Sequence, residues 1–532
     1  MRVESICIVG GGSAGWMTAA LLSHEHPDVE IALIESENIK PIGVGESTLQ
    51  HFNRFLKRLE LKDEDWMPSC NATYKASIRF KNFRDGKGET FQYPFGDMDR
   101  EGDMDRMDTW IMRFFELQCM YGKDKYPSEE FAQFINRQTY LADAGIMTRE
   151  MPGILDREES NWDLDNDTSY HLNADKFGEY LRDNIAVPNG VHHIKGDVHN
   201  VIKTPEGYIK SVISLDGGCI SADLFIDCTG FRSLLLETHM GVDFVPFNDM
   251  LFNDSALVTH IDYKDKETEM HCYTDCVAMN NGWVYNIPMW NNIGTGYVYS
   301  SKYINECEAE LEFREYLNDQ DCPLMPIKIK HGRHDVGWTK NVVGIGLAYG
   351  FLEPLESTGL MTTHENLILL SDTLSQRDRI VTKHDRDVFN HQTEKIIESM
   401  KNFVTLHYTL SCRDDTQYWR DCTETIDFGK FEHGINEATL IGLNDYRNLL
   451  DSLEMKTWES DNMGEGTIYI TAGMGVRPIS EAFFKEKRSH EEGGLQAVRD
   501  AHKAYQKDKE IMLDWVSKQP SHYEYLKEHI YV

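Results

Sequence analysis

Residues 6–15 read Ile-Cys-Ile-Val-Gly-Gly-Gly-Ser-Ala-Gly, an apolar run that ends in the spacing Gly10-x-Gly12-x-x-Gly15. A helix-like apolar run follows, and a second strand-like run ends at Glu35, twenty residues after Gly15. Glycines at this spacing let backbone N–H groups approach a pyrophosphate at a helix N-terminus, and the acid can accept hydrogen bonds from a ribose. The stretch therefore predicts a dinucleotide-binding α/β unit, although it does not choose between FAD and NAD. The residues expected to line this site are Gly10, Gly12, Ser13, Ala14, Gly15 and Glu35.

Three later stretches are predicted to complete the same unit. Residues 43–48 form a second glycine-rich turn, which is either an ordinary capped loop or a place where the backbone approaches a flat ligand. An apolar strand ends in Asp227-x-x-Gly230, which is typical of FAD proteins of the glutathione-reductase type. A buried strand over residues 341–350 brings Gly346 to the sheet edge where open α/β folds bind ligands. The site residues expected from these stretches are Gly45, Glu46, Ser47, Asp227, Gly230, Gly346 and Leu347.

A lysine stands in an alternating stretch, residues 73–80, that reads as one strand with an apolar and a polar face. The polar face, which carries Lys75, is either simply solvated or turned into a closed cavity, where one ammonium can orient or carry an electrophile. Downstream, the aromatic-rich residues 91–96 either pack in the core or wall a site for a planar substrate through Tyr93, Pro94 and Phe95.

A bend is predicted at residues 350–360, which read Gly-Phe-Leu-Glu-Pro-Leu-Glu-Ser-Thr-Gly-Leu. Pro354 fixes its own φ and favours an extended residue before it. Ser357 or Thr358 could cap a helix that starts here, and the free N–H groups of that helix would face an incoming anion, with Glu356 beside it. The alternative is an ordinary capped turn.

Composition excludes several classes of partner. A formal net charge of −34 argues against nucleic acid and anionic membranes, which both need clustered Lys and Arg. No apolar run reaches the roughly 18 residues of a membrane span, and a strand that begins almost at Met1 is not a cleavable leader. The eleven cysteines are scattered without a Cys-x-x-Cys pair, so we expect no metal, no disulfide framework and a cytoplasmic location.

The order of these signals predicts an α/β (α+β) chain with an FAD-binding fold of the glutathione-reductase or hydroxylase type. It should contain an inserted antiparallel sheet, with a hairpin over residues 282–299, and a mostly helical C-terminal lobe. The predicted FAD domain with its β-rich substrate region covers 1–384, with a nucleotide core at about 1–80, 165–235 and 340–384, and the helical lobe over the substrate site covers 385–532. The glycine-rich residues 464–475 are expected to interrupt that lobe.

A set of motifs spread over most of the chain is shared with one known family. They are residues 10–16, 43–48, Lys75 within Tyr-Lys-x-x-Ile-Arg-Phe, 227–231, Trp283-x-Tyr285-x-Ile287-Pro288, Pro-Leu-Glu-Ser-Thr-Gly at 354–359, 407–408, 413–419 and 473–475. In these motifs the chain resembles the flavin-dependent tryptophan-halogenase family, the lysine and Pro-Leu-Glu-Ser-Thr-Gly elements being the specific ones. It is similar to a divergent member of the family. A viral member is one option for its source, and in that case the expected location is the host cytosol.

The resemblance implies that reduced FAD, oxygen and a halide yield hypohalous acid. In this interpretation the backbone of Thr358 and Gly359 holds the halide, and the acid passes through an internal tunnel to Lys75. Lys75 either forms a haloamine or hydrogen-bonds the acid; a neighbouring Glu356 favours a charged ammonium, and hence the hydrogen-bonding role. Glu356 would then take the proton that the aromatic ring loses after electrophilic attack.

Two departures from the family bear on the substrate. Tyr285 stands where the family has a second tryptophan, and residues 430–470, where the family places aromatics around tryptophan, do not match. A small aromatic such as a phenol or another indole is therefore at least as good an expectation as free tryptophan. Its expected contacts are Tyr93, Pro94, Phe95 and Glu356, and the sequence does not choose between chloride, bromide and iodide.

Two alternatives remain at this point. An FAD-dependent aromatic monooxygenase would need neither Lys75 nor a halide site, and it usually carries a Gly-Asp-Ala-x-His-like segment where this chain has Gly-Leu-Ala-Tyr-Gly at 346–350. A non-catalytic flavin-binding protein is the other. Because no second nucleotide motif is visible, we expect a separate flavin reductase to supply reduced FAD. The oligomeric state is open, a homo-oligomer included.

Overall fold

The computed structural model describes residues 1–38, 45–96, 104–152, 162–426, 461–477, 481–490 and 494–532. These residues form two compact units, each built from three separate stretches of the chain. The first unit comprises Met1–Ala72, His171–Asp254 and Lys328–Lys401, and the second comprises Thr73–Tyr170, Ser255–Ile327 and Asn402–Val532. The domain division expected from the sequence stays a prediction.

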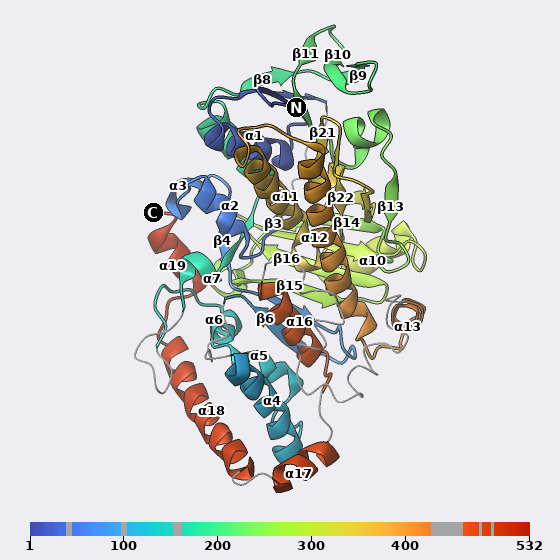
Figure 1. Cartoon of the computed structure of the whole chain (residues 1–532). Coiled ribbons are helices and arrows are strands. Elements are labelled where there is room, and N and C mark those ends of the chain that lie inside the picture. The colour runs from blue at the N-terminus through green and yellow to red at the C-terminus, as the bar shows by residue number, and fades with distance from the viewer. Residues whose placement is uncertain (39–44, 97–103, 153–161, 427–460, 478–480, 491–493) are drawn as a thin grey trace. The chain divides into compact units, whose positions relative to one another are not determined.

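A six-stranded sheet forms the centre of the first unit (Figure 1). Its order is β20 (Trp338–Thr339), β21 (Val342–Gly344), β12 (Leu224–Asp227), β1 (Ser5–Val9), β2 (Glu30–Glu35) and β8 (His192–Lys195). All neighbours are parallel except β20 at the edge. Strands β1, β2, β12 and β21 are mainly apolar, as is usual for a parallel sheet that helices cover. The carboxyl ends of β1, β12 and β21 therefore lie side by side, at the edge where such folds bind nucleotides.

Helices and short sheets surround this centre. The helices are α1 (Ser13–Glu25), α2 (Phe52–Arg58), α3 (Asp63–Trp66), α8 (Ala174–Leu181) and α11 (Thr358–Ser375). Helix α12 (Lys383–Thr409) starts in the first unit and ends in the second. Strand β3 (Glu46–Ser47) pairs with β7 (Ser169–Leu172), while β9 (Val198–Lys203), β10 (Ile209–Ser214) and β11 (Cys219–Ser221) form a small meander. A further small sheet joins β13 (Phe244–Pro246), β19 (Gly332–His334) and β22 (Gly350–Phe351).

A seven-stranded sheet forms the centre of the second unit. Its order is β18 (Met325–Lys328), β14 (Ser255–Ile261), β17 (Ile293–Tyr299), β16 (Gly282–Pro288), β15 (Tyr273–Ala278), β5 (Ser77–Lys81) and β6 (Thr90–Pro94). The hairpin predicted over residues 282–299 is confirmed, with Trp283 opposite Val298 and Tyr285 opposite Gly296. The predicted α/β fold with an inserted, largely antiparallel sheet is confirmed.

The stretch around Lys75 differs from the single strand that its alternation predicts. It forms two strands, β4 (Thr73–Lys75) and β5, with Ala76 between them. The backbone N–H of Ala76 donates to the carbonyl of Cys272 at 2.7 Å, outside the β5 ladder. This break separates Lys75 from Ser77 and Arg79, the two residues expected on the same polar face.

The rest of the second unit is mostly helical, and the predicted helical C-terminal lobe is confirmed for the part of the chain that the structure describes. Its main helices are α4 (Met104–Tyr121), α5 (Phe131–Ile135), α6 (Gln138–Ala144), α7 (Leu164–Asp167), α9 (Lys266–Glu269), α10 (Glu306–Leu317), α13 (Gln417–Glu424), α16 (Asp461–Gly473), α17 (Glu481–His490), α18 (Gly494–Val516) and α19 (His522–His529). No helix among the described residues is long and apolar enough to cross a membrane.

The glycine-rich residues 464–475 do not interrupt the helical lobe, so that prediction was wrong. Helix α16 runs through most of them. A Cβ on Gly466 would lie 2.8 Å from the Tyr93 hydroxyl, and a Cβ on Gly473 would lie 2.3 Å from the Phe91 ring. The glycines are therefore the places where this helix packs directly on the aromatic side chains of β6, which outweighs their low helix propensity.

Candidate functional site

The glycine turn after β1 has two positions fixed by packing and one that faces open space. A Cβ on Gly10, which has φ +113°, would lie 2.3 Å from the Cys228 carbonyl oxygen. A Cβ on Gly15 would lie 1.9 Å from the Gly10 carbonyl oxygen. Gly12, at φ −73°, has nothing within 4 Å of its Cβ position. The open side of Gly12, directly before the N-terminus of α1, is thus a cradle that a side chain would fill and that suits a pyrophosphate.

The acid predicted for the ribose lies beside this turn. Glu35 ends β2, and a Cβ on Gly11 would lie 1.7 Å from its Oε2, so the carboxylate rests against the glycine backbone. His193 Nε2 lies 2.6 Å from Glu35 Oε1 and holds the other oxygen. The carboxylate is therefore oriented at the turn, as a ribose contact requires.

The third predicted loop is tied together by a buried carboxylate. Asp227 is fully buried and accepts hydrogen bonds from the backbone N–H groups of Thr229, Leu235 and Leu236 at 3.0, 2.6 and 2.8 Å. Burial raises the pKa of Asp227, and these hydrogen bonds oppose the shift. Asp227 thus shapes the loop that contains Gly230 at φ +65°.

The end of β21 meets the start of α1. Gly346 has φ +64°, and a Cβ there would lie 2.9 Å from the Cβ of Ala14. Gly346 and Leu347 belong to the short 3-10 helix η5 (Gly346–Ala348). The loops after β1 and β21 therefore adjoin, and their residues, with Gly12 and Glu35, fit a bound dinucleotide such as FAD.

Substituting Gly12 by alanine is expected to weaken FAD binding by about tenfold or more, which corresponds to about 1.4 kcal/mol. The added methyl group would meet no protein atom, so the melting temperature should stay close to that of the wild type. Fluorescence titration with FAD and a thermal melt measure the two quantities. Gly196→Ala, whose Cβ would make only ordinary contacts at 3.7 Å, is the control; equal FAD affinity in Gly12→Ala and the wild type would contradict the cradle.

The predicted bend places a buried carboxylate directly before a helix. The 3-10 helix η6 (Pro354–Glu356) ends at Ser357, which has φ +57°, and α11 begins at Thr358. Glu356 is fully buried. Ser357 is the N-cap residue of α11, one of the two expected, but its hydroxyl makes no capping hydrogen bond and instead meets the Ser47 hydroxyl at 3.0 Å.

Residues of the second glycine-rich stretch lie next to the start of α11. Besides the Ser47 contact, a Cβ on Gly359 would lie 3.0 Å from Glu46 Oε1. The first turn of α11 points backbone N–H groups toward this region, and a helix N-terminus attracts anions. The structure thus brings Glu46 and Ser47 together with Thr358 and Gly359 in the first unit.

Lys75 belongs to the second unit and is fully buried. Its Nζ lies 4.8 Å from the centroid of the Phe95 ring, a cation–π contact that is stronger away from water. Phe95 and Pro94 are buried, and the Tyr93 ring stacks on Tyr469 at 5.9 Å between centroids. The lysine is therefore turned into the aromatic interior and not into solvent. The contact of Tyr469 with Tyr93 was not predicted from the sequence, because Tyr469 lies within the glycine-rich residues 464–475, which were expected to form a break and not a helix.

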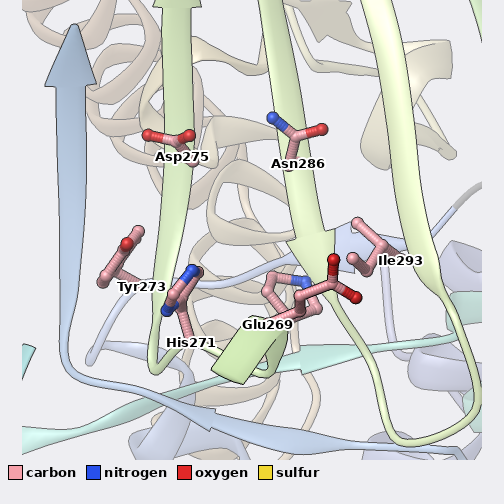
Figure 2. A pocket seen from close by; sticks show the side chains of 7 residues that line it. Glu269, His271, Tyr273, Asp275, Asn286 and Ile293 are labelled. Carbon is pink, nitrogen blue, oxygen red and sulfur yellow. The ribbon is translucent and has the colours of Figure 1, made fainter. Parts of the chain in front are cut away.

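A separate pocket lies on one face of the seven-stranded sheet (Figure 2). Asn286 and Pro288 of β16 line it, and they alternate with Tyr285 and Ile287, which face the opposite side. Its volume is 170 Å³, and it is lined by Glu269, His271, Tyr273, Asp275, Asn286, Pro288 and Ile293. Arg79 pairs with Asp275 at 2.8 Å beside it. None of the residues predicted for cofactor, halide or substrate lines this pocket.

No cluster of His, Cys, Asp or Glu within the described ranges could hold a metal ion. All eleven cysteines are free thiols. The residues 431–436, which do not match the family at the substrate end, lie outside the described residues.

Comparison with known proteins agrees with this architecture. Residues 5–459 match the family model described as tryptophan halogenase. The 7-chloro-L-tryptophan 6-halogenase KtzR of Kutzneria sp. (strain 744) is 35% identical over 432 residues, which cover 78% of this chain and 81% of that protein. The solved structure of VirX1 in its apo form superposes with a TM-score of 0.90 at 46% identity over 100% of both chains. The tryptophan 6-halogenase SttH of Streptomyces toxytricini does so with a TM-score of 0.82 at 30% identity, over 99% of this chain and 100% of that one.

These matches, which extend over most of the chain, define a flavin-dependent enzyme of the halogenase type. The chain belongs to the tryptophan halogenase family.

Proposed function

We propose that the chain uses FADH2, oxygen and a halide to halogenate a small aromatic molecule by way of Lys75. The observation that carries this proposal is the fully buried Lys75, whose ammonium lies on the Phe95 ring within the family's lysine motif. An ammonium that is closed off from water beside an aromatic ring can orient an electrophile inside the protein.

Residues of the first unit would bind the cofactor and the halide. Gly10, Gly12 and Gly15 would receive the pyrophosphate, with Glu35 at the ribose. Reduced FAD, once bound, would reduce oxygen by two electrons. Halide would give up two further electrons to the reduced oxygen and become hypohalous acid, and the second oxygen atom would leave as water. The N–H groups at the start of α11, at Thr358 and Gly359, would hold the halide through the positive end of the helix.

Residues of the second unit would guide the electrophile. Lys75 would donate a hydrogen bond to the oxygen of the hypohalous acid, which makes its halogen more electrophilic. Attack by the aromatic ring forms the carbon–halogen bond, the halogen–oxygen bond breaks, and water leaves with the proton from the ammonium. Glu356 would accept the proton that the ring loses, and so restore its aromaticity.

The proposed substrate is a phenol or an indole bounded by Tyr93, Pro94 and Phe95. KtzR and SttH are named for tryptophan substrates. The proposed substrate is not restricted to free tryptophan, because Tyr285 replaces the family's second tryptophan and residues 430–470 depart from the family's pattern.

The chain by itself is expected not to oxidise NADPH, because a second dinucleotide motif is not visible in the sequence: Gly344-x-Gly346 is followed by Gly350, which has the wrong spacing. Adding a flavin reductase, FAD and NADPH should yield halogenated aromatics in a panel of phenols and indoles. Mass spectrometry of the panel, run separately with chloride, bromide and iodide, measures this. NADPH oxidation by the purified chain would contradict the reductase proposal, and hydroxylated products without halide would favour a monooxygenase.

A further inference from the structure

The backbone that leads into the proposed halide site is fixed at the start of the bend, in β22. Strand β22 pairs with β19, with Phe351 opposite Gly332 and Gly350 opposite Arg333. A Cβ on Gly350 would lie 2.8 Å from the Gly332 carbonyl oxygen, so these strands approach unusually closely. Two residues later the chain reaches Glu353 and then the turn that carries Glu356.

Glu353 is a fully buried carboxylate with a defined amide partner. Asn253 Nδ2 donates to Glu353 Oε2 at 2.7 Å, and Asn253 is itself only 1% exposed. The backbone carbonyl of Asn253 in turn accepts from Nε2 of His331. Burial lowers the pKa of His331 to about 4, so its ring is neutral at ordinary pH and carries one proton for this contact. A chain of buried groups thus connects His331 to Glu353.

The far side of the bend has contacts of its own. The Thr358 hydroxyl donates to the Glu353 carbonyl at 3.2 Å, which closes the turn, and the Ser357 hydroxyl meets Ser47 at 3.0 Å. Ser357 adopts a left-handed backbone, which a non-glycine residue keeps only when its surroundings impose it. Glu356 therefore lies between one residue held through Glu353 and another held through Ser47.

We propose that Glu353 and Asn253 are positioning residues that hold the turn carrying Glu356 and the first N–H groups of α11 in their working geometry. This proposal rests on the proposed function, in which those groups bind halide and accept a proton. Neither residue touches the halide in this account; both act through the backbone between Glu353 and Thr358. A misplacement of about 1 Å at such a site can lower a rate by about 100-fold.

The test compares four variants of the full-length chain with bromide as the halide, a flavin reductase and an aromatic that the wild type halogenates. Glu353→Leu and Asn253→Ala each remove the hydrogen bond, Glu353→Gln keeps an acceptor oxygen, and the double variant combines Glu353→Leu with Asn253→Ala. The apparent KM for bromide, kcat, the Kd for FAD and the melting temperature are measured for each. Asn341→Ala is the control, because buried Asn341 also donates through Nδ2, to the carbonyls of Ile209 and Asp223 at the sheet edge.

The positioning role predicts a bromide KM raised about tenfold or more in Glu353→Leu and Asn253→Ala, with the Kd for FAD within about twofold of the wild type. Glu353→Gln should stay near the wild type, and the double variant should lose no more than the worse single variant. Asn341→Ala should lower the melting temperature without changing the bromide KM.

A lower melting temperature in Asn253→Ala and Glu353→Leu with an unchanged bromide KM would overturn the proposal and leave these residues a purely structural role. If Glu353→Leu does not fold, Asn253→Ala and Glu353→Gln decide the question in the same way. A wild-type chain that yields no halogenated product with chloride, bromide or iodide would instead overturn the proposed function, and the positioning role with it.

Discussion

Replacing Lys75 by methionine is expected to lower the formation of halogenated product by about 10³-fold, while oxygen still oxidises reduced FAD. Methionine preserves most of the length and apolar character of the buried side chain but removes the ammonium over Phe95. The FAD cradle belongs to the other unit and should be unaffected. Product is measured by mass spectrometry and flavin oxidation by absorbance, in the same reaction.

Lys81→Met is the matched control for that experiment. Lys81 stands six residues later, at the end of β5, and is partly exposed. The Lys81→Met variant should form halogenated product at the wild-type rate. If Lys75→Met yields as much product as Lys81→Met, the proposed role of Lys75 fails. If both yield hydroxylated product without halide, the chain is an aromatic monooxygenase.

Replacing Glu356 by glutamine should lower kcat about 10²-fold or more, because a fully buried amide fills the same space but cannot accept the ring proton. The loss should appear in kcat more than in the KM for bromide, unlike that of Glu353→Leu. A substrate deuterated at the reacting carbon should show a larger isotope effect in Glu356→Gln, since proton loss then limits the rate.

The control for this substitution is Glu394→Gln, which removes a charge from a half-exposed carboxylate paired with Arg333 at 2.5 Å. It should leave kcat unchanged. An equal kcat in Glu356→Gln and the wild type, with no change in the isotope effect, would exclude Glu356 as the proton acceptor.

The nucleotide unit could be predicted because its signals are local. The strand, the three glycines, the helix and Glu35 all lie within thirty residues, and each has a backbone reason that spacing reveals. The structure adds what spacing cannot: packing dictates Gly10 and Gly15, whereas Gly12 faces open space. Asp227 could be placed at the end of its strand, but its hydrogen bonds to residues eight and nine positions later could not be foreseen.

Contacts between distant parts of the sequence escaped prediction. Asn253 and Glu353 are one hundred residues apart, and no motif surrounds Asn253. The glycines of α16 predicted a break, because low helix propensity is visible in a sequence and a neighbouring ring is not. Tyr93 and Phe91 occupy the space that side chains at Gly466 and Gly473 would need, so tertiary packing decided the conformation.

The most direct test of the account is a double-mutant cycle between Lys75 and Glu356. Lys75→Arg keeps a cation with altered geometry and should leave measurable activity, as should Glu356→Gln. Measured as kcat/KM for the aromatic substrate, the two losses should be coupled by about 0.5–3 kcal/mol, because the proposed mechanism has both side chains act on the same reaction. Losses that simply multiply in the double variant would contradict the claim that these residues share a site.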